Sequence, residues 1–216
     1  MSKGLKIGII VAVIAVICVV GFLIARNLGG KSVGIDPNTT NEKGKQGNTS
    51  LDSSKVLVVY FSQGGNTQKL AKLISDRVGG DFVRIETVQT YPSPETNYNE
   101  LADMAKKERD DDARPELKDM DINLDDYDTI FVGYPIWWYT LPMPLYTFFD
   151  TYDLSGKTIV PFNTHEGSGN GGTYETIKGF EPKATVLEGL PIRGEDMAND
   201  QSSKVDNWLK ELGFIK

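Results

Sequence analysis

The segment Ser62–Thr67, SQGGNT, combines two hydroxyl side chains with two glycines, directly after residues suited to a buried strand, Val58–Phe61. Backbone N–H groups at the start of a helix bind a phosphate through hydrogen bonds and the positive end of the helix dipole. No Lys or Arg lies within the segment, so it suits a phosphate that stays bound rather than one that is transferred. It also lacks the GK[ST] ending of a nucleotide-hydrolysing loop and the GxGxxG of a dinucleotide site. The segment predicts a phosphate site, with a capped strand-to-helix turn as the plainer alternative.

A second segment, residues 133–144 (GYPIWWYTLPMP), places two adjacent tryptophans and a tyrosine between prolines. Such side chains are costly to leave in water, so they either pack against neighbouring helices or hold a ligand. A flat aromatic surface beside a phosphate site suits a planar heterocycle that stacks on the ring. The segment therefore predicts one wall of a cofactor site, and packing within the core is the alternative.

A third segment, residues 163–172 (NTHEGSGNGG), contains the only histidine of the chain, His165. The glycines around it let backbone N–H groups approach a ligand closely. A single histidine is more often a capped loop residue than a catalytic one, and we assign no catalytic residue. The alternative is a histidine that tunes a bound cofactor or donates a proton to it.

Strand and helix patterns alternate along residues 55–216 and would position these three segments. Apolar runs predict strands at 55–61, 82–88, 127–135, 157–164 and 184–191. Helical spacing predicts helices at 68–78, 95–112, 144–152, 174–180 and 200–213. Five strands separated by helices predict an α/β fold with one doubly wound parallel sheet. Ligands bind beyond the carboxyl ends of the strands in such sheets, which is where the three segments fall.

In this order, YFSQGGNT, YPIWWYTLPMPLYTFF and PFNTHEGSGNGG resemble the motifs of the flavodoxin family, over residues 55–216. The resemblance implies a three-layer fold with a five-stranded parallel sheet in the order 2-1-3-4-5, and noncovalently bound FMN. It implies that the FMN phosphate is held by Ser62, Gln63, Gly64, Gly65, Asn66 and Thr67. The isoalloxazine would be bordered by Pro135, Ile136, Trp137 and Trp138. Its pyrimidine side would be closed by Thr164, His165, Glu166, Gly167, Ser168 and Gly169.

Gly64 departs from the family pattern, which usually has Thr at this position. One hydroxyl contact to the phosphate is therefore missing, and we expect FMN to bind less tightly than is usual in the family.

The resemblance leaves three classes of function open. We expect a one-electron carrier, in which the flavin performs the redox chemistry and the protein sets its potential. The alternatives are an NAD(P)H-dependent quinone or FMN-type oxidoreductase on the same fold, and a binding domain that has lost its flavin.

The first 28 residues predict a transmembrane anchor, and residues 29–54 a flexible linker of Gly, Ser, Thr, Asn and Lys. Residues 7–25 hold no charge and would extend about 28 Å as a helix, which matches the hydrocarbon core of a bilayer. A cleaved signal peptide and a lipoprotein signal fit less well, because no small-x-small site follows the apolar run and Ile17 precedes Cys18. We expect a single-pass protein of the cell membrane. The favoured orientation places the domain outside the cytoplasm, and a cytoplasmic domain is the alternative.

Charge is unevenly distributed along the chain. Residues 51–216 hold 17 Lys and Arg against 28 Asp and Glu, whereas residues 1–50 hold 6 against 2. An acidic domain argues against a nucleic-acid partner and favours a basic redox protein, with a small electron acceptor as the other possibility. With one cysteine, the chain forms no internal disulfide.

Overall fold

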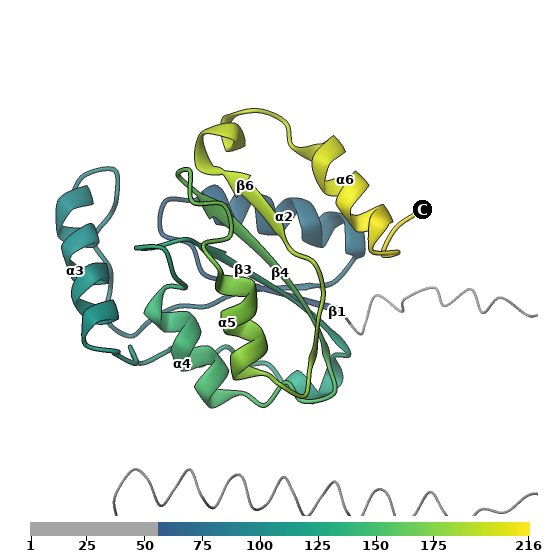
Figure 1. Cartoon of the computed structure of the whole chain (residues 1–216), viewed down its shortest axis with the longest axis horizontal. Helices are drawn as coiled ribbons and strands as arrows, with labels where there is room; N and C mark the ends of the chain where they lie inside the picture. The colour runs from purple at the N-terminus through teal and green to yellow at the C-terminus, as the bar shows by residue number, and fades with distance from the viewer. Residues whose placement is uncertain (1–55) are drawn as a thin grey trace, which may run out of the picture. The chain divides into compact units, whose positions relative to one another are not determined.

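A parallel sheet forms the centre of residues 56–216, the part of the chain that the structure, a computed structural model, describes. The strands are β1 (Val56–Tyr60), β2 (Asp81–Arg84), β3 (Thr129–Pro135), β4 (Thr158–His165), β5 (Thr185–Val186) and β6 (Leu190–Arg193). They lie in the order β2-β1-β3-β4-β5, and every pair is parallel (Figure 1). The predicted α/β fold and the strand order 2-1-3-4-5 are confirmed.

The fifth position of the sheet differs from the single predicted strand at 184–191. Two short strands occupy it, since both β5 and β6 pair with β4. The interruption coincides with Pro161 of β4, which has no N–H to donate. It also coincides with Gly189, where a side chain would collide with the ring of Tyr174. The chain therefore shifts between two pairings where a continuous strand would meet a proline and a ring.

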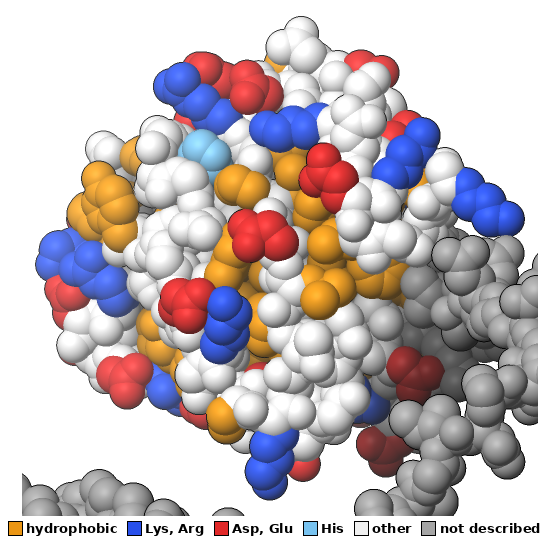
Figure 2. All heavy atoms as spheres, turned by 45° about the vertical axis from the view of Figure 1, so that its right-hand side comes forward, with side chains coloured by type: hydrophobic (Ala, Val, Ile, Leu, Met, Phe, Trp, Pro, Cys, Tyr) orange, Lys and Arg blue, Asp and Glu red, His pale blue; other side chains and the backbone are white. Residues whose placement is uncertain are grey.

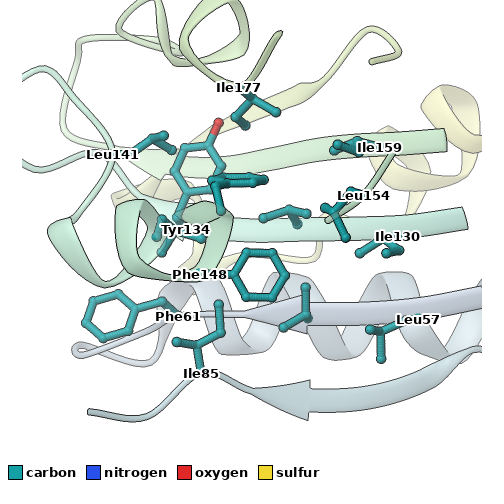
Figure 3. Close-up of a cluster of buried hydrophobic side chains, with 14 of the residues drawn as sticks. Leu57, Phe61, Ile85, Ile130, Tyr134, Leu141, Phe148, Leu154, Ile159 and Ile177 are labelled. Atoms are coloured by element: carbon teal, nitrogen blue, oxygen red, sulfur yellow. The ribbon is translucent and has the colours of Figure 1, made fainter. Parts of the chain in front are cut away.

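The central strands are buried on both faces, which explains why they read as continuous apolar runs. Alternate residues of β1 point to opposite sides, so Leu57 and Val59 join one core cluster and Val58 joins the other. Figure 3 shows part of the first cluster, in which the ring of Phe148 lies among side chains of the sheet that include Leu57 and Ile130.

Helices cover both faces of the sheet and complete the three layers. Helices α2 (Asn66–Val78) and α6 (Ser202–Glu211) contribute buried residues to the second cluster. Helices α4 (Met143–Thr151) and α5 (Thr173–Phe180) contribute to the first (Figure 1). The helical spacing of apolar residues in the sequence therefore identifies the helix faces that pack against the sheet.

Helix α3 (Tyr98–Asp110) packs differently from the other helices. It is 13 residues long, as α2 is, yet it buries only Leu101 and Ala105 whereas α2 buries five residues. In Figure 1, α3 lies at the left, apart from the strands. Its prediction at 95–112 was too long at both ends, because a turn from Ser93 to Asn97 precedes the helix.

The predicted membrane anchor (1–28) and linker (29–54) lie outside the residues that the structure describes, and both stay predictions. Within residues 56–216, no helix has the length and apolar character that a membrane span requires.

Candidate functional site

The carboxyl ends of β1, β3 and β4 bring the three predicted segments together around one cavity of about 250 Å³. Eleven predicted site residues line it: Ser62, Gln63, Gly64, Asn66, Thr67, Pro135, Ile136, Trp137, Thr164, His165 and Glu166. Three further lining residues come from the segment after β2 and were not predicted: Pro94, Tyr98 and Leu101. The cavity lies where parallel sheets of this kind bind ligands.

The first segment, residues 62–67, bends between β1 and α2 and is named the phosphate loop after its predicted ligand. Within residues 56–216, no protein group accepts a hydrogen bond from the N–H of Gln63, Gly64 or Gly65. The first N–H groups of α2 also have no intrahelical acceptor, because a helix supplies none there. Gly65 has a φ of 83°, a left-handed conformation that side chains with a β-carbon disfavour. The loop thus presents a set of free donors, as an anion site needs.

Two side chains of the phosphate loop fix it to the third segment and to the turn after β6. The hydroxyls of Thr67 and Thr164 lie 2.8 Å apart and are buried. Asn66 donates from its side-chain amide to the carbonyl of Gly194 at 3.1 Å. A β-carbon at Gly194 would crowd the Glu166 carboxylate, which is the flexible end of a side chain and can move aside. The hydrogen bonds of Asn66 and Thr67 are therefore the contacts that fix the loop at this point.

Two more contacts fix the other side of the loop. The side-chain amide of Gln63 donates to the carbonyl of Tyr91 at 3.1 Å. The guanidinium of Arg84, on β2, donates to the carbonyl of Ser62 at 2.7 Å. The loop itself has no cation, but the fold brings one to its backbone, which the sequence pattern did not reveal.

The two tryptophans of the second segment have different surroundings. Trp137 is half-buried and meets the rings of Phe61 and Tyr91 edge-on, with centroids 5.3 and 5.4 Å away. Trp138 is 40% exposed, and its indole N–H donates to the carbonyl of Ala102 on α3 at 2.9 Å. Trp137 therefore borders the 250 Å³ cavity, whereas Trp138 connects its loop to α3.

Trp138 and Tyr139 form the tip of a tight hairpin. Trp137 and Thr140 exchange two backbone hydrogen bonds, at 3.0 and 3.1 Å. Both tip residues have positive φ, 50° and 64°, which is the geometry of a type I′ turn. Bulky residues are rare in this conformation, and such strained positions cluster at functional sites. Tyr139 is 75% exposed, so its ring stands at the mouth of the site.

A second compartment of about 470 Å³ adjoins the first, and five lining residues are common to both. Its lining from α3 and the hairpin tip is mostly apolar or aromatic: Tyr98, Leu101, Ala102, Ala105, Ile136, Trp137, Trp138 and Tyr139. Glu166, Gly167 and Ser168 close it from the third segment. The predicted residues Gly65 and Gly169 line neither compartment. Together the compartments form one cleft, between α3 and the three segments.

The α3 wall was missed by sequence reasoning, although its residues gave a signal. Tyr98, Leu101, Ala102 and Ala105 recur at helical spacing, which correctly predicts an apolar face. The spacing does not say whether such a face covers the sheet or lines a cleft. Tyr98 is 67% exposed at the start of that face.

His165 ends β4 and is partly buried beside the cavity. Its Nδ1 accepts a hydrogen bond from the N–H of Gly167 at 2.9 Å. Burial lowers the pKa of the imidazole, and the nearby Glu166 carboxylate opposes this in part. A neutral ring whose Nδ1 accepts carries its hydrogen on Nε2, so His165 offers a donor.

A buried polar network holds the third segment in place. Asn163 is fully buried and donates to the carbonyl of Gly169 at 3.0 Å, while its oxygen accepts from the hydroxyl of Tyr174 at 2.8 Å. The N–H of Ile136 donates to the carbonyl of Thr164 at 2.8 Å, which connects the second and third segments. No group of three or more potential metal-ligating side chains occurs among residues 56–216. The hydrogen bonds of Asn163 and Ile136 therefore hold the third segment against the second.

Comparison with known proteins identifies solved structures that are similar to this chain. A protein from Bacteroides eggerthii, proposed to be a flavoprotein, is 34% identical, and the match covers 73% of this chain and 97% of that one with a TM-score of 0.64. A second such protein, from Bacteroides uniformis, is 31% identical over 74% of this chain and 99% of that one, also with a TM-score of 0.64. A flavoprotein from Lactobacillus acidophilus, solved in complex with FMN, shares the fold at 21% identity, over 72% of this chain and 98% of that one, with a TM-score of 0.57.

No curated protein matches the chain. The sequence profile of the family described as Flavodoxin matches residues 55–212, which is most of the sequence. The chain therefore belongs to the flavodoxin family.

Proposed function

We propose that the chain binds FMN noncovalently in the cleft and serves as an electron-transfer protein. The observation that carries this proposal is the row of free N–H groups in the phosphate loop, at one end of a cleft with an aromatic wall. The Lactobacillus acidophilus flavoprotein, which has the same fold, was solved with FMN. Bound FMN supplies the redox chemistry, and the protein contributes binding, orientation and electrostatics.

The residues present fit this cofactor. The phosphate loop would hold the phosphate, Ile136 and Trp137 would border the ring system, and the Nε2–H of His165 would face its pyrimidine side. Tyr98 and Leu101 of α3 would cover the opposite side and exclude water. A donor at the pyrimidine oxygen stabilises the negative charge that grows there on reduction.

Titration of purified protein with FMN, riboflavin and FAD tests the proposal. FMN should bind far more tightly than riboflavin, because each lost hydrogen bond to a charged phosphate costs roughly 1.5 to 3 kcal/mol. Flavin fluorescence measures all three affinities. Equal affinity for riboflavin and FMN would contradict the proposal that the phosphate loop binds the FMN phosphate.

An NAD(P)H-dependent oxidoreductase is the second candidate, and the outer compartment favours it. That compartment lies beside the expected ring position and is open enough for a small electron acceptor. Anaerobic reduction in small steps distinguishes the two functions. Two separate one-electron steps with slow NADH and NADPH oxidation support the carrier. Fast, saturable nicotinamide oxidation with direct two-electron reduction supports the oxidoreductase.

For a carrier, we propose a basic redox protein as the partner. The net charge of −11 over residues 51–216 favours such a protein over an acidic one. On the face shown in Figure 2, acidic and basic side chains are interspersed, so the overall charge rather than a patch on this face would guide association. Association rates that fall with added salt would support this partner class, and salt-independent rates would argue against it.

We also propose a single-pass membrane anchor at residues 7–25, with the domain outside the cytoplasm. Protease added to intact cells should then remove the domain. Cleavage only after lysis would place the domain inside. Recovery of the full chain in the aqueous fraction would contradict the anchor itself.

A further inference from the structure

Tyr91, in the loop after β2, lies behind the cleft rather than in it. Its side chain is 5% exposed, and it lines neither compartment. A residue in this position cannot touch a bound cofactor, but it can hold the residues that do.

Tyr91 contacts two walls of the cleft directly. Its carbonyl accepts the hydrogen bond from Gln63 of the phosphate loop at 3.1 Å. Its ring packs edge-on against Trp137, with centroids 5.4 Å apart, and against Phe61 at 5.8 Å. The phosphate loop and the aromatic wall therefore share one support.

Its hydroxyl reaches the third wall. The Tyr91 hydroxyl donates to the carboxylate of Glu108 on α3 at 2.7 Å. Glu108 follows Leu101 and Ala105 at helical spacing, so it lies on the same side of α3 as they do, although it lines a separate recess rather than either compartment of the cleft. α3 buries only these two residues, and the hydrogen bond from Tyr91 adds to the contacts that Trp138 makes with Ala102 and Arg109 of the same helix.

We propose that Tyr91 is a positioning residue that holds α3 against the cleft and thereby sets the affinity for the flavin. This inference rests on the proposed function for the affinity, whereas the placement of α3 stands independently of it. Hydrogen bonds to charged groups are stronger than neutral ones, so a single hydroxyl is enough to bias the position of a weakly packed helix.

The chain offers a matched control. The buried Tyr127 also donates its hydroxyl to a carboxylate, that of Asp81, at the same 2.7 Å. Asp81 begins β2, so this second pair lies at the amino ends of the strands, away from the cleft. Tyr91→Phe and Tyr127→Phe therefore remove the same chemical group from two places.

Titration of the full-length wild type and variants with FMN tests the proposal. Tyr91→Phe and Glu108→Ala should each raise the Kd about tenfold, as expected when a hydrogen bond to a charged group is lost. Tyr127→Phe should change it less than twofold. Glu108→Gln retains an acceptor for the tyrosine, so it should stay within about threefold of the wild type.

Hydrogen exchange of the flavin-free protein provides the second readout. Tyr91→Phe should speed exchange along α3 relative to α2, whereas Tyr127→Phe should not. Equal FMN affinities and equal α3 exchange in the two variants would overturn the proposal. A wild type that does not bind FMN would overturn the proposed function, and the exchange of α3 would still decide how that helix is held.

Discussion

Helices α2 and α3 have the same length, 13 residues, but they contribute to the cleft in different ways. α2 buries Leu70, Ala71 and Ile74 against the sheet, and its first turn continues directly from the phosphate loop. α3 buries two residues and is held by side-chain hydrogen bonds from Tyr91 and Trp138.

This difference in packing means that the two ends of the cleft are held with different firmness. Dense apolar packing resists displacement, so the phosphate end is fixed by the core of the fold. The ring end is bounded by a helix and a hairpin that depend on a few polar contacts. Regions with few buried apolar contacts open more readily, which would suit the end where, in the proposed function, a partner or substrate reaches the flavin.

The largest expected effect is a loss of unfolding free energy when a buried leucine of α2 is replaced, compared with the same replacement on α3. Leu70→Ala removes a fully buried side chain from α2 and should lower the free energy of unfolding by about 3 kcal/mol. Leu101→Ala on α3 should cost about half as much, because its site at the cleft wall can collapse more easily. Urea unfolding measures both losses. Equal losses would show that α3 is packed as firmly as α2.

A change in the phosphate loop should affect binding rather than folding. Gly65→Val places a β-branched residue at a φ of 83°, and the strain of about 1 to 3 kcal/mol should weaken FMN binding roughly ten- to hundredfold. Gly64→Ala is the matched control, because its β-carbon would make only an ordinary contact with Pro94 at 3.5 Å. If both variants bind FMN like the wild type, the loop geometry is not what selects the phosphate.

The ring end should instead control the reduction potential. His165→Ala removes the Nε2–H donor and should lower the potential by about 60 mV, which corresponds to about 1.4 kcal/mol for one electron. Potentiometric titration at neutral pH measures the shift, with Gly64→Ala as the variant expected to leave the potential unchanged. An unaltered potential would make His165 a structural residue of the third segment.

The smallest expected effect is a pH dependence of the unfolding free energy that arises from one carboxyl group of α3, that of Glu108. Burial raises the pKa of Glu108, and the hydrogen bond from Tyr91 opposes this in part. The folded protein therefore binds this proton more tightly than the unfolded chain does, so unfolding free energy should fall as pH rises from about 4.5 through the raised pKa.

Glu108→Gln should lose this part of the pH dependence, and urea midpoints measured across the range check it. Lys107 and Arg114 line the same recess as Glu108, but they form ion pairs with other carboxylates, those of Asp111, Asp112 and Asp150. An identical pH profile in Glu108→Gln and the wild type would contradict the role of Glu108.

Much of the fold could be predicted from the sequence, because buried parallel strands and amphipathic helices leave local periodicities. The order of the strands followed from the resemblance of the three segments to the family. The two-part edge strand did not, since it depends on Pro161 and on the contact between Gly189 and Tyr174, which are close only in the folded chain.

The candidate site divides in the same way. The three segments gave most of the lining of the inner cavity, because their glycine, hydroxyl and aromatic residues are unusual at strand ends. The α3 wall and the cation of Arg84 were missed, since both come from segments with ordinary composition. Their positions depend on partners distant in sequence, such as Ser62 for Arg84 and Tyr91 for Glu108.

The direction of β1 has a consequence for the way the molecule can be approached. The described chain enters the sheet at Val56, the amino end of β1, whereas the cleft lies beyond the carboxyl end of the same strand. Five residues at about 3.3 Å each separate the two by roughly 16 Å of sheet. Whatever precedes Val56 therefore joins the domain at the amino ends of the strands, at the edge of the sheet opposite the one that holds the cleft.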